Sequence, residues 1–193
     1  MINPKYLTRN LKDQFMNNKP FPHLVLPEFF DSKNLTKVLA ELKKEEFHLK
    51  NSDLFTLHQT SSLSHTKNKI LKDFYNFLNS KEFKEFIQKN TGTKAFGEID
   101  CYGFQYKDTN YLLPHDDSSE NRKIAYVINL SKNLTSESGG SLQFFKKDQV
   151  VKTITPEFNT FVIFQVIQGK TYHQVTEILE NKGRYTISGW FNV

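Results

Sequence analysis

The spacing of hydrophobic residues along this chain changes near residue 94. Upstream of that point, apolar residues recur three and four positions apart in three runs, which is typical of amphipathic helices. The first run follows Asp31 or Ser32 as a helix cap, the second covers 70–78, and the third lies between the cap Ser80 and Gly92. The pattern therefore predicts three helices in the N-terminal half.

The segment before these helices is more polar. Residues 1–20 show helical spacing only at Leu7, Leu11 and Phe15, and we expect them to form a mobile arm. Residues 21–27, which contain prolines near both ends, are typical of a short strand.

Downstream of Lys94 the chain consists of short β-rich segments separated by turn residues. We expect strands at 96–106, 111–117, 122–130, 141–145, 149–154, 160–166, 171–178 and 184–192. Gly139-Gly140 should form a tight turn before the fourth of these. Eight short strands without intervening helices favour a sandwich or jelly roll over a parallel α/β sheet. With no repeat and no long linker, 21–193 should be one domain, with helical support over 21–93 and β-structure over 94–193.

Composition and charge exclude several function classes. The chain has 193 residues, a net charge of +5 and a pI near 9.1, but its lysines are scattered and form no nucleic-acid-binding motif. No apolar run approaches the ~18 residues of a membrane span, and the N-terminus lacks the apolar core of a secretory signal. The single cysteine, Cys101, cannot form an internal disulfide and is expected to be a small buried hydrophobe. These features predict a cytoplasmic protein that does not bind membranes or nucleic acid.

The candidate chemistry begins at His115 and Asp117. Two positions apart on a strand, their side chains would point to the same face and could chelate a divalent metal. By itself this His-x-Asp pair is a common chance occurrence. His173 lies far enough along the chain to come from another strand, and it would complete a two-histidine, one-carboxylate triad that is diagnostic of non-haem Fe(II) sites. Asp116 would point to the opposite face and is not expected to be a ligand.

Arg184 opens the last expected strand, after a turn at 181–183. Thr186 and Ser188 would share its face. A guanidinium grips a carboxylate through two parallel hydrogen bonds, and a buried arginine carries a large desolvation penalty. Arg184 therefore implies an anionic partner, either a protein group or a ligand.

The ordered set His-x-Asp, Gly-Gly, Pro, His, Arg-x-Thr and Gly-Trp-Phe resembles the Fe(II)- and 2-oxoglutarate-dependent oxygenases of the prolyl hydroxylase group. Segments 111–117 and 122–126 are similar to the catalytic domain of the ribosomal prolyl hydroxylases. The resemblance covers roughly residues 20–193 and implies a double-stranded β-helix (jelly roll) with the helices packed on one sheet.

The resemblance also assigns roles to particular residues. It implies that iron is bound by His115, Asp117 and His173, that 2-oxoglutarate is bound by Arg184, Tyr106, Thr186 and Asn129, and that the substrate pocket includes Trp190, Arg122 and Leu113. Asn129 stands where prolyl hydroxylases commonly have a tyrosine, so this part of the pocket departs from the family pattern.

The implied activity is hydroxylation of a prolyl residue in a protein or peptide, with O2 as cosubstrate, release of succinate and CO2, and stimulation by ascorbate. We expect a monomer or weak dimer. The eukaryotic ribosomal hydroxylases carry a second, non-catalytic barrel, for which this chain has no room, and that departure weakens the transfer of their substrate. Two alternatives stay open: an oxygenase of a free amino acid or other small molecule, and a non-enzymatic β-sandwich binding module with a vestigial metal site.

Overall fold

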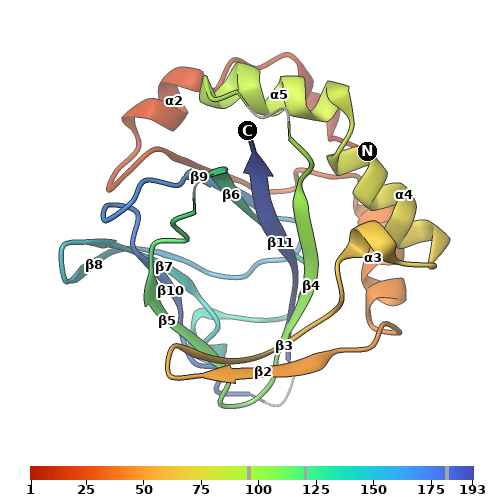
Figure 1. Cartoon of the computed structure of the whole chain (residues 1–193), viewed down its shortest axis with the longest axis vertical. Helices are drawn as coiled ribbons and strands as arrows, with labels where there is room; N and C mark the ends of the chain where they lie inside the picture. Colours follow the sequence, from red (N-terminus) through yellow and green to blue (C-terminus); the bar gives the residue numbers. More distant parts are fainter. Residues whose placement is uncertain (95–96, 120, 181–182) are drawn as a thin grey trace.

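The computed structural model of the chain describes residues 1–94, 97–119, 121–180 and 183–193. Within these ranges, eleven strands form one antiparallel sheet that curls around an interior (Figure 1). The strands are β1 (His23–Leu26), β2 (His48–Ser52), β3 (Phe55–Gln59), β4 (Asp100–Tyr106), β5 (Tyr111–His115), β6 (Arg122–Asn129), β7 (Leu142–Lys146), β8 (Gln149–Ile154), β9 (Phe161–Gln165), β10 (His173–Val175) and β11 (Arg184–Asn192).

The strand order explains how distant segments meet. It runs β1-β9-β6-β11-β4-β3-β5-β10-β7-β8, with β2 paired to β3. All eight expected strands downstream of residue 94 are present, although the start of the first (96) and most of the turn at 181–183 lie outside the described residues. β5 and β10 are neighbours, as are β4 and β11. The strands that carry the candidate ligands therefore lie side by side.

Helices cover one outer face of the sheet (Figure 1). They are α1 (Pro4–Leu7), α2 (Lys12–Asn17), α3 (Ser32–Leu42), α4 (Lys69–Leu78) and α5 (Lys81–Thr91), with short 3-10 turns η1 (Leu63–His65) and η2 (Ser136–Ser138). The predicted caps are confirmed. The Asp31 side chain accepts a hydrogen bond from the backbone N–H of Asn34, the Ser80 hydroxyl accepts one from Phe83, and Gly92 ends α5 with a left-handed φ of 73°.

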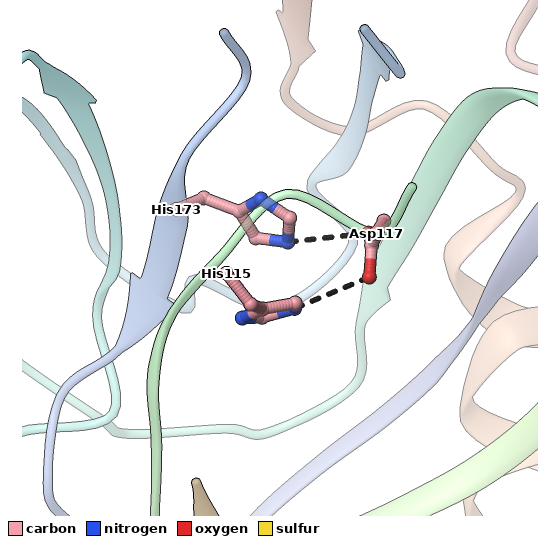
Figure 2. A group of neighbouring side chains, drawn as sticks. All are labelled: His115, Asp117 and His173. Carbon is pink, nitrogen blue, oxygen red and sulfur yellow. Dashed lines mark ion pairs between the residues drawn. The ribbon is translucent and has the colours of Figure 1, made fainter. Parts of the chain in front are cut away.

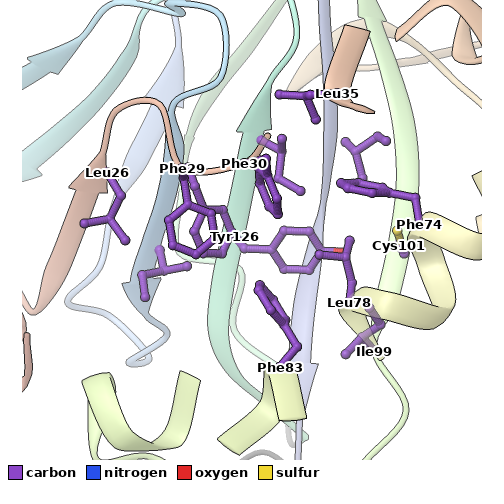
Figure 3. Close-up of a cluster of buried hydrophobic side chains, with 14 of the residues drawn as sticks. Leu26, Phe29, Phe30, Leu35, Phe74, Leu78, Phe83, Ile99, Cys101 and Tyr126 are labelled. Carbon is purple, nitrogen blue, oxygen red and sulfur yellow. The ribbon is translucent and has the colours of Figure 1, made fainter. Parts of the chain in front are cut away.

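Alternation along the central strands builds two separate cores. On β9, Phe161 and Ile163 face the helices, whereas Val162 and Phe164 face the interior of the barrel. The helix-side core is rich in aromatic side chains, and Phe29 and Phe83 from the helical half pack there around Tyr126 of β6 (Figure 3).

Two expectations for the N-terminal half need correction. Residues 1–20 are packed and do not form a detached arm: Tyr6, Leu11 and Phe15 are buried in the helix-side core, because their apolar side chains fill the space beside α5. Segment 21–93 also supplies more than helical support. Its hairpin β2–β3 joins the sheet, and β3 pairs with both β4 and β5. The hairpin thereby links the two walls of the barrel.

None of the helices in the described ranges is long and apolar enough to span a membrane.

Candidate active site

Three potential ligand side chains converge at one end of the barrel interior (Figure 2). The Nε2 atom of His115 lies 3.2 Å from one carboxylate oxygen of Asp117, and the Nε2 atom of His173 lies 3.2 Å from the other. The potential ligand atoms of the three residues all lie within 4.8 Å of one another. In the described part of the chain this is the one group of three histidine, cysteine or acidic residues with such geometry.

The two residues of the His-x-Asp pair converge for a different reason from the one expected. β5 ends at His115, so Asp117 lies beyond the strand, with a left-handed φ of 59°. Strand alternation therefore does not aim its carboxylate. The turn that follows β5 directs the carboxylate of Asp117 instead. Asp116 points away from the three-residue group, as expected for a residue that is not a ligand.

A bulge sets the direction of His115. In the pairing of β5 with β10, His115 lies opposite His173 and Leu112 lies opposite Val175, so β5 has one more residue than β10 over this stretch. The extra residue breaks the alternation, and Leu112 lines the same cavity as His115. Leu113, expected in the substrate pocket, is instead outside the cavity lining and 40% exposed.

Hydrogen bonds orient both imidazoles. The Nδ1 atom of His115 lies 2.9 Å from the backbone carbonyl of Leu113, and the Nδ1 atom of His173 lies 3.0 Å from that of Thr171. Since a carbonyl only accepts, each Nδ1 carries the proton and each Nε2 faces Asp117. This is the tautomer that a metal-binding imidazole needs.

The electrostatics of the group favour a cation between its members. For Asp117, burial acts to raise the pKa, but the two imidazoles outweigh burial and hold it well below its usual range. For His115, burial acts to lower the pKa, but the hydrogen bond and charge of Asp117 outweigh burial and raise it. The carboxylate is therefore ionised and attracts positive charge to this point.

Arg184 lies deep in the same cavity and is only 2% exposed. Its guanidinium carbon is 5.0 Å from the centre of the Tyr106 ring, and within the described residues its Nε has no hydrogen-bond partner. Burial lowers the pKa of Arg184, which Tyr106 partly opposes, but a guanidinium stays charged in proteins. A buried cation with an unused donor calls for an anion supplied from outside the chain.

The expected turn at Gly139-Gly140 supports that arginine. Gly139 and Gly140 have φ values of 73° and 67°, and β7 follows. A Cβ added to Gly140 would lie 2.9 Å from Cδ of Arg184 and closer still to Cδ1 of Ile178. The turn thus packs directly on the arginine side chain.

The cavity that joins these groups has a volume of about 380 Å³. His115, Asp117 and His173 line one side, and the inward-facing residues of β11 (Arg184, Thr186, Ser188 and Trp190) line another. Near Trp190, the guanidinium carbon of Arg122 lies 3.5 Å from the centre of the indole ring. The cavity therefore has a cationic end at Arg184, a potential metal site, and an aromatic wall.

Asn129 lies behind this lining. It is buried opposite Thr186, and its Nδ2 atom lies 3.5 Å from the backbone carbonyl of Thr160. An asparagine is too short to take the place of a tyrosine here, and it does not line the cavity. The role of Asn129 toward the cosubstrate therefore stays a prediction from the resemblance.

Sequence reasoning missed several cavity residues. Tyr102 and Phe104 lie on β4 two positions apart, on the same face as Tyr106, and Leu54 and Phe55 come from the β2–β3 hairpin. Alternate residues of a strand share a face, so the position of Tyr106 predicts that Tyr102 and Phe104 also face the cavity. The hairpin residues carry no such signal.

The fold and the site together define a class of protein. Residues 102–192 match the 2OG-Fe(II) oxygenase superfamily, so this part of the chain carries a domain of that type. It is 34% identical to prolyl 3,4-dihydroxylase OGFOD1 of Ostreococcus tauri over 206 residues, which cover 95% of this chain and 40% of that protein. It is 33% identical to prolyl 3-hydroxylase OGFOD1 of Mus musculus over 180 residues, which cover 89% of this chain and 33% of that protein. The chain thus spans between a third and two fifths of the length of these relatives.

A solved structure confirms the fold. The crystal structure of a Pseudomonas putida prolyl-4-hydroxylase superposes with a TM-score of 0.78 at 15% identity, covering 94% of this chain and 96% of that chain. The predicted double-stranded β-helix with helices on one face is therefore confirmed, as is the resemblance to prolyl hydroxylases.

Proposed function

We propose that this chain is an Fe(II)- and 2-oxoglutarate-dependent dioxygenase that hydroxylates a prolyl residue of a protein or peptide. One observation carries the proposal: a two-histidine, one-carboxylate group lines the same cavity as a buried arginine whose Nε has no hydrogen-bond partner among the described residues. The relatives named above are prolyl hydroxylases, which supports proline as the target.

The donor set fits Fe(II). His115 and His173 each present a nitrogen lone pair and Asp117 presents an ionised carboxylate, a mixed set that suits Fe(II) and leaves coordination positions for other ligands. In this proposal the three residues hold the iron, and the Leu113 and Thr171 carbonyls fix the direction of the imidazoles.

Arg184 would bind the distal carboxylate of 2-oxoglutarate. Its charge is desolvated, so a carboxylate in the cavity gains a strong charge-assisted hydrogen bond. The Tyr106 ring packs against the guanidinium and limits its position, and burial raises the pKa of Tyr106 to about 12, so that its hydroxyl stays a neutral donor. Thr186, on the same face of β11, adds a hydroxyl beside them.

The substrate would enter past Arg122 and Trp190. The indole ring and the guanidinium are stacked, which leaves the apolar ring to contact a prolyl side chain and the in-plane N–H groups to bind a peptide carbonyl. Leu112, which lines the cavity, would take the substrate-contacting role that the resemblance implies for Leu113.

Bound Fe(II), 2-oxoglutarate and O2 supply the chemistry, in which the keto acid is oxidised to succinate and CO2 and one oxygen atom enters the substrate. The chain holds and orients the reactants and excludes water. Phe164 packs against His173 with ring centres 4.6 Å apart, and Leu57, Leu142 and Val175 keep that side of the cavity apolar.

The test measures succinate release and substrate hydroxylation in the same reaction. The protein is incubated with Fe(II), 2-oxoglutarate and either proline-containing peptides or free amino acids, and mass spectrometry looks for addition of one oxygen atom. We expect peptide hydroxylation by the wild type, none by His173→Ala, and full activity of the control His65→Ala, whose side chain is exposed. Hydroxylation of free amino acids alone would favour the small-molecule alternative. Absence of succinate with every substrate would refute the proposal.

The other expectations stay predictions from the sequence. They are a cytoplasmic location, a monomeric or weakly dimeric state, stimulation by ascorbate, and one oxygenase domain over residues 21–193. Sedimentation at several concentrations would test the assembly state.

A further inference from the structure

We propose that Asp116, the residue between two of the potential ligands, is a positioning residue that holds the metal site in its binding geometry. It would do so by joining the turn that carries Asp117 to the turn that precedes His173. This inference rests on the metal site of the proposed function and adds a residue to which none of the roles above is assigned.

The Asp116 carboxylate makes two backbone contacts. One oxygen accepts a hydrogen bond of 3.0 Å from the N–H of Ser118, and the other accepts one of 2.7 Å from the N–H of Gly169. The first contact closes the turn around Asp117, and the second reaches 53 residues along the chain. Hydrogen bonds from a backbone N–H to a carboxylate are shorter and stronger than neutral ones.

The contact at Gly169 leads on to the second histidine. Gly169 lies in a tight turn that Thr171 closes: the Thr171 hydroxyl lies 3.1 Å from the N–H of Ile167, and the Thr171 N–H donates to the carbonyl of Ile167. The carbonyl of Thr171 then accepts from Nδ1 of His173. Asp116 is therefore connected, through one compact turn, to the group that orients the His173 ring.

The two hydrogen bonds of the Asp116 carboxylate form what we call the Asp116 clamp. The conformation of Asp117 explains why this clamp is needed. Asp117 lies outside the sheet and has a left-handed φ of 59°, which is unfavourable for a residue with a side chain. Conformations of this kind persist only where the surroundings hold them. The Asp116 carboxylate accepts hydrogen bonds from the residue after Asp117 and from the turn at Gly169, so it is placed to keep that conformation before any ligand arrives.

A clamp of this kind predicts an effect on metal affinity beyond its effect on folding. Substitutions of residues that orient metal ligands typically weaken binding by about 10- to 100-fold. We expect Asp116→Ala to lie in this range. Asp116→Asn keeps one acceptor oxygen but places an NH2 group opposite the other N–H, so its loss should be smaller than that of the alanine variant.

The experiment uses Co(II) as a spectroscopic probe of the metal-free protein, with no turnover involved. Absorption titrations give the Co(II) affinity and the d–d spectrum of the wild type, Asp116→Ala, Asp116→Asn and the control Asp148→Ala. Asp148 is exposed in the turn between β7 and β8, so its substitution removes the same charge away from the site. Thermal unfolding of each metal-free variant reports folding separately.

The expected result is weaker Co(II) binding and an altered spectrum for Asp116→Ala, an intermediate affinity for Asp116→Asn, and wild-type values for Asp148→Ala. If Asp116→Ala fails to fold, the asparagine variant decides. Wild-type affinity and spectrum in a folded Asp116 variant would overturn the inference while leaving the proposed function intact. A wild-type protein that binds no Co(II) would overturn the metal site itself, and the clamp with it.

Discussion

Arg184 and Tyr106 form a buried pair at the closed end of the cavity, with 5.0 Å between the guanidinium carbon and the ring centre. The two residues are directly opposite each other on β11 and β4, so the pairing of these strands fixes their relative position. A cation that is held against an aromatic face and is otherwise unpaired at Nε is prepared for an anion of defined orientation.

Arg184→Lys should weaken 2-oxoglutarate binding while it leaves the metal site unchanged. Lysine keeps the positive charge but loses the planar fork, and a hydrogen bond to a charged group contributes about 1.5–3 kcal/mol. The expected loss is therefore roughly 10- to 100-fold in affinity. Calorimetric titration with 2-oxoglutarate in the presence of Mn(II) measures it, and Co(II) affinity is the control. An unchanged 2-oxoglutarate affinity would remove Arg184 from the cosubstrate site.

Gly140→Ala should displace the side chain of Arg184. The added methyl group would lie 2.9 Å from Cδ of Arg184, and the backbone there has a φ of 67°, which alanine adopts only with strain. We expect a higher KM for 2-oxoglutarate and a lower unfolding temperature. Gly92→Ala is a matched control for the backbone strain, since its φ is 73°, it ends α5 on the outer face of the sheet, and the three atoms nearest to the added Cβ would belong to the flexible side chain of Lys12. Equal KM values for the two variants would show that the methyl group does not move Arg184.

Much of this architecture could be predicted from the sequence, because the signals are local. The helices of residues 31–92 follow from apolar spacing and from the caps Asp31 and Ser80, and the later strands follow from β-forming runs between turns. The four residues with the clearest chemistry, two histidines, an aspartate and an arginine, are recognisable by type and order. Pairing of β5 with β10 places the two histidines opposite each other.

The parts that could not be predicted depend on contacts between distant segments. β2 is exposed along its whole length and shows no alternation, so its strand conformation comes from pairing with β3. The choice between Leu112 and Leu113 depends on a bulge that is defined only by the register with β10. The conformation of Asp117 depends on the turn that Asp116 stabilises. No local pattern records these three facts.

Cys101 should be unreactive in the folded protein at alkaline pH. The thiol is fully buried, and burial raises its pKa to about 12, with a smaller opposing effect of the Tyr126 hydroxyl. In the unfolded chain the thiol should titrate near ~8.5. At pH 9, a thiol-specific disulfide reagent should label the native protein slowly and the urea-unfolded protein at once. Rapid labelling of the native state would show that β4 opens.

The raised pKa of Cys101 also makes the free energy of unfolding depend on pH. Because the pKa of Cys101 is higher in the folded than in the unfolded state, its contribution to stability is fully present below the unfolded pKa and is lost as pH rises toward 12. Cys101→Ala should therefore reduce the fall in unfolding free energy between about pH 8.5 and 11, even if the cavity that it leaves lowers stability at neutral pH.

Arg122 should affect the peptide substrate and not the cosubstrate. Its guanidinium lies over the ring of Trp190 and is only partly buried, whereas Arg184 is fully buried. Replacing Arg122 with glutamine keeps a hydrogen-bonding side chain but removes the stacked cation, a contact that contributes about 0.5–2 kcal/mol. We expect a several-fold higher KM for a hydroxylatable peptide and an unchanged rate of 2-oxoglutarate turnover without peptide. If both change together, the stacked pair acts on the whole cavity, and if neither changes, the substrate does not pass over Trp190.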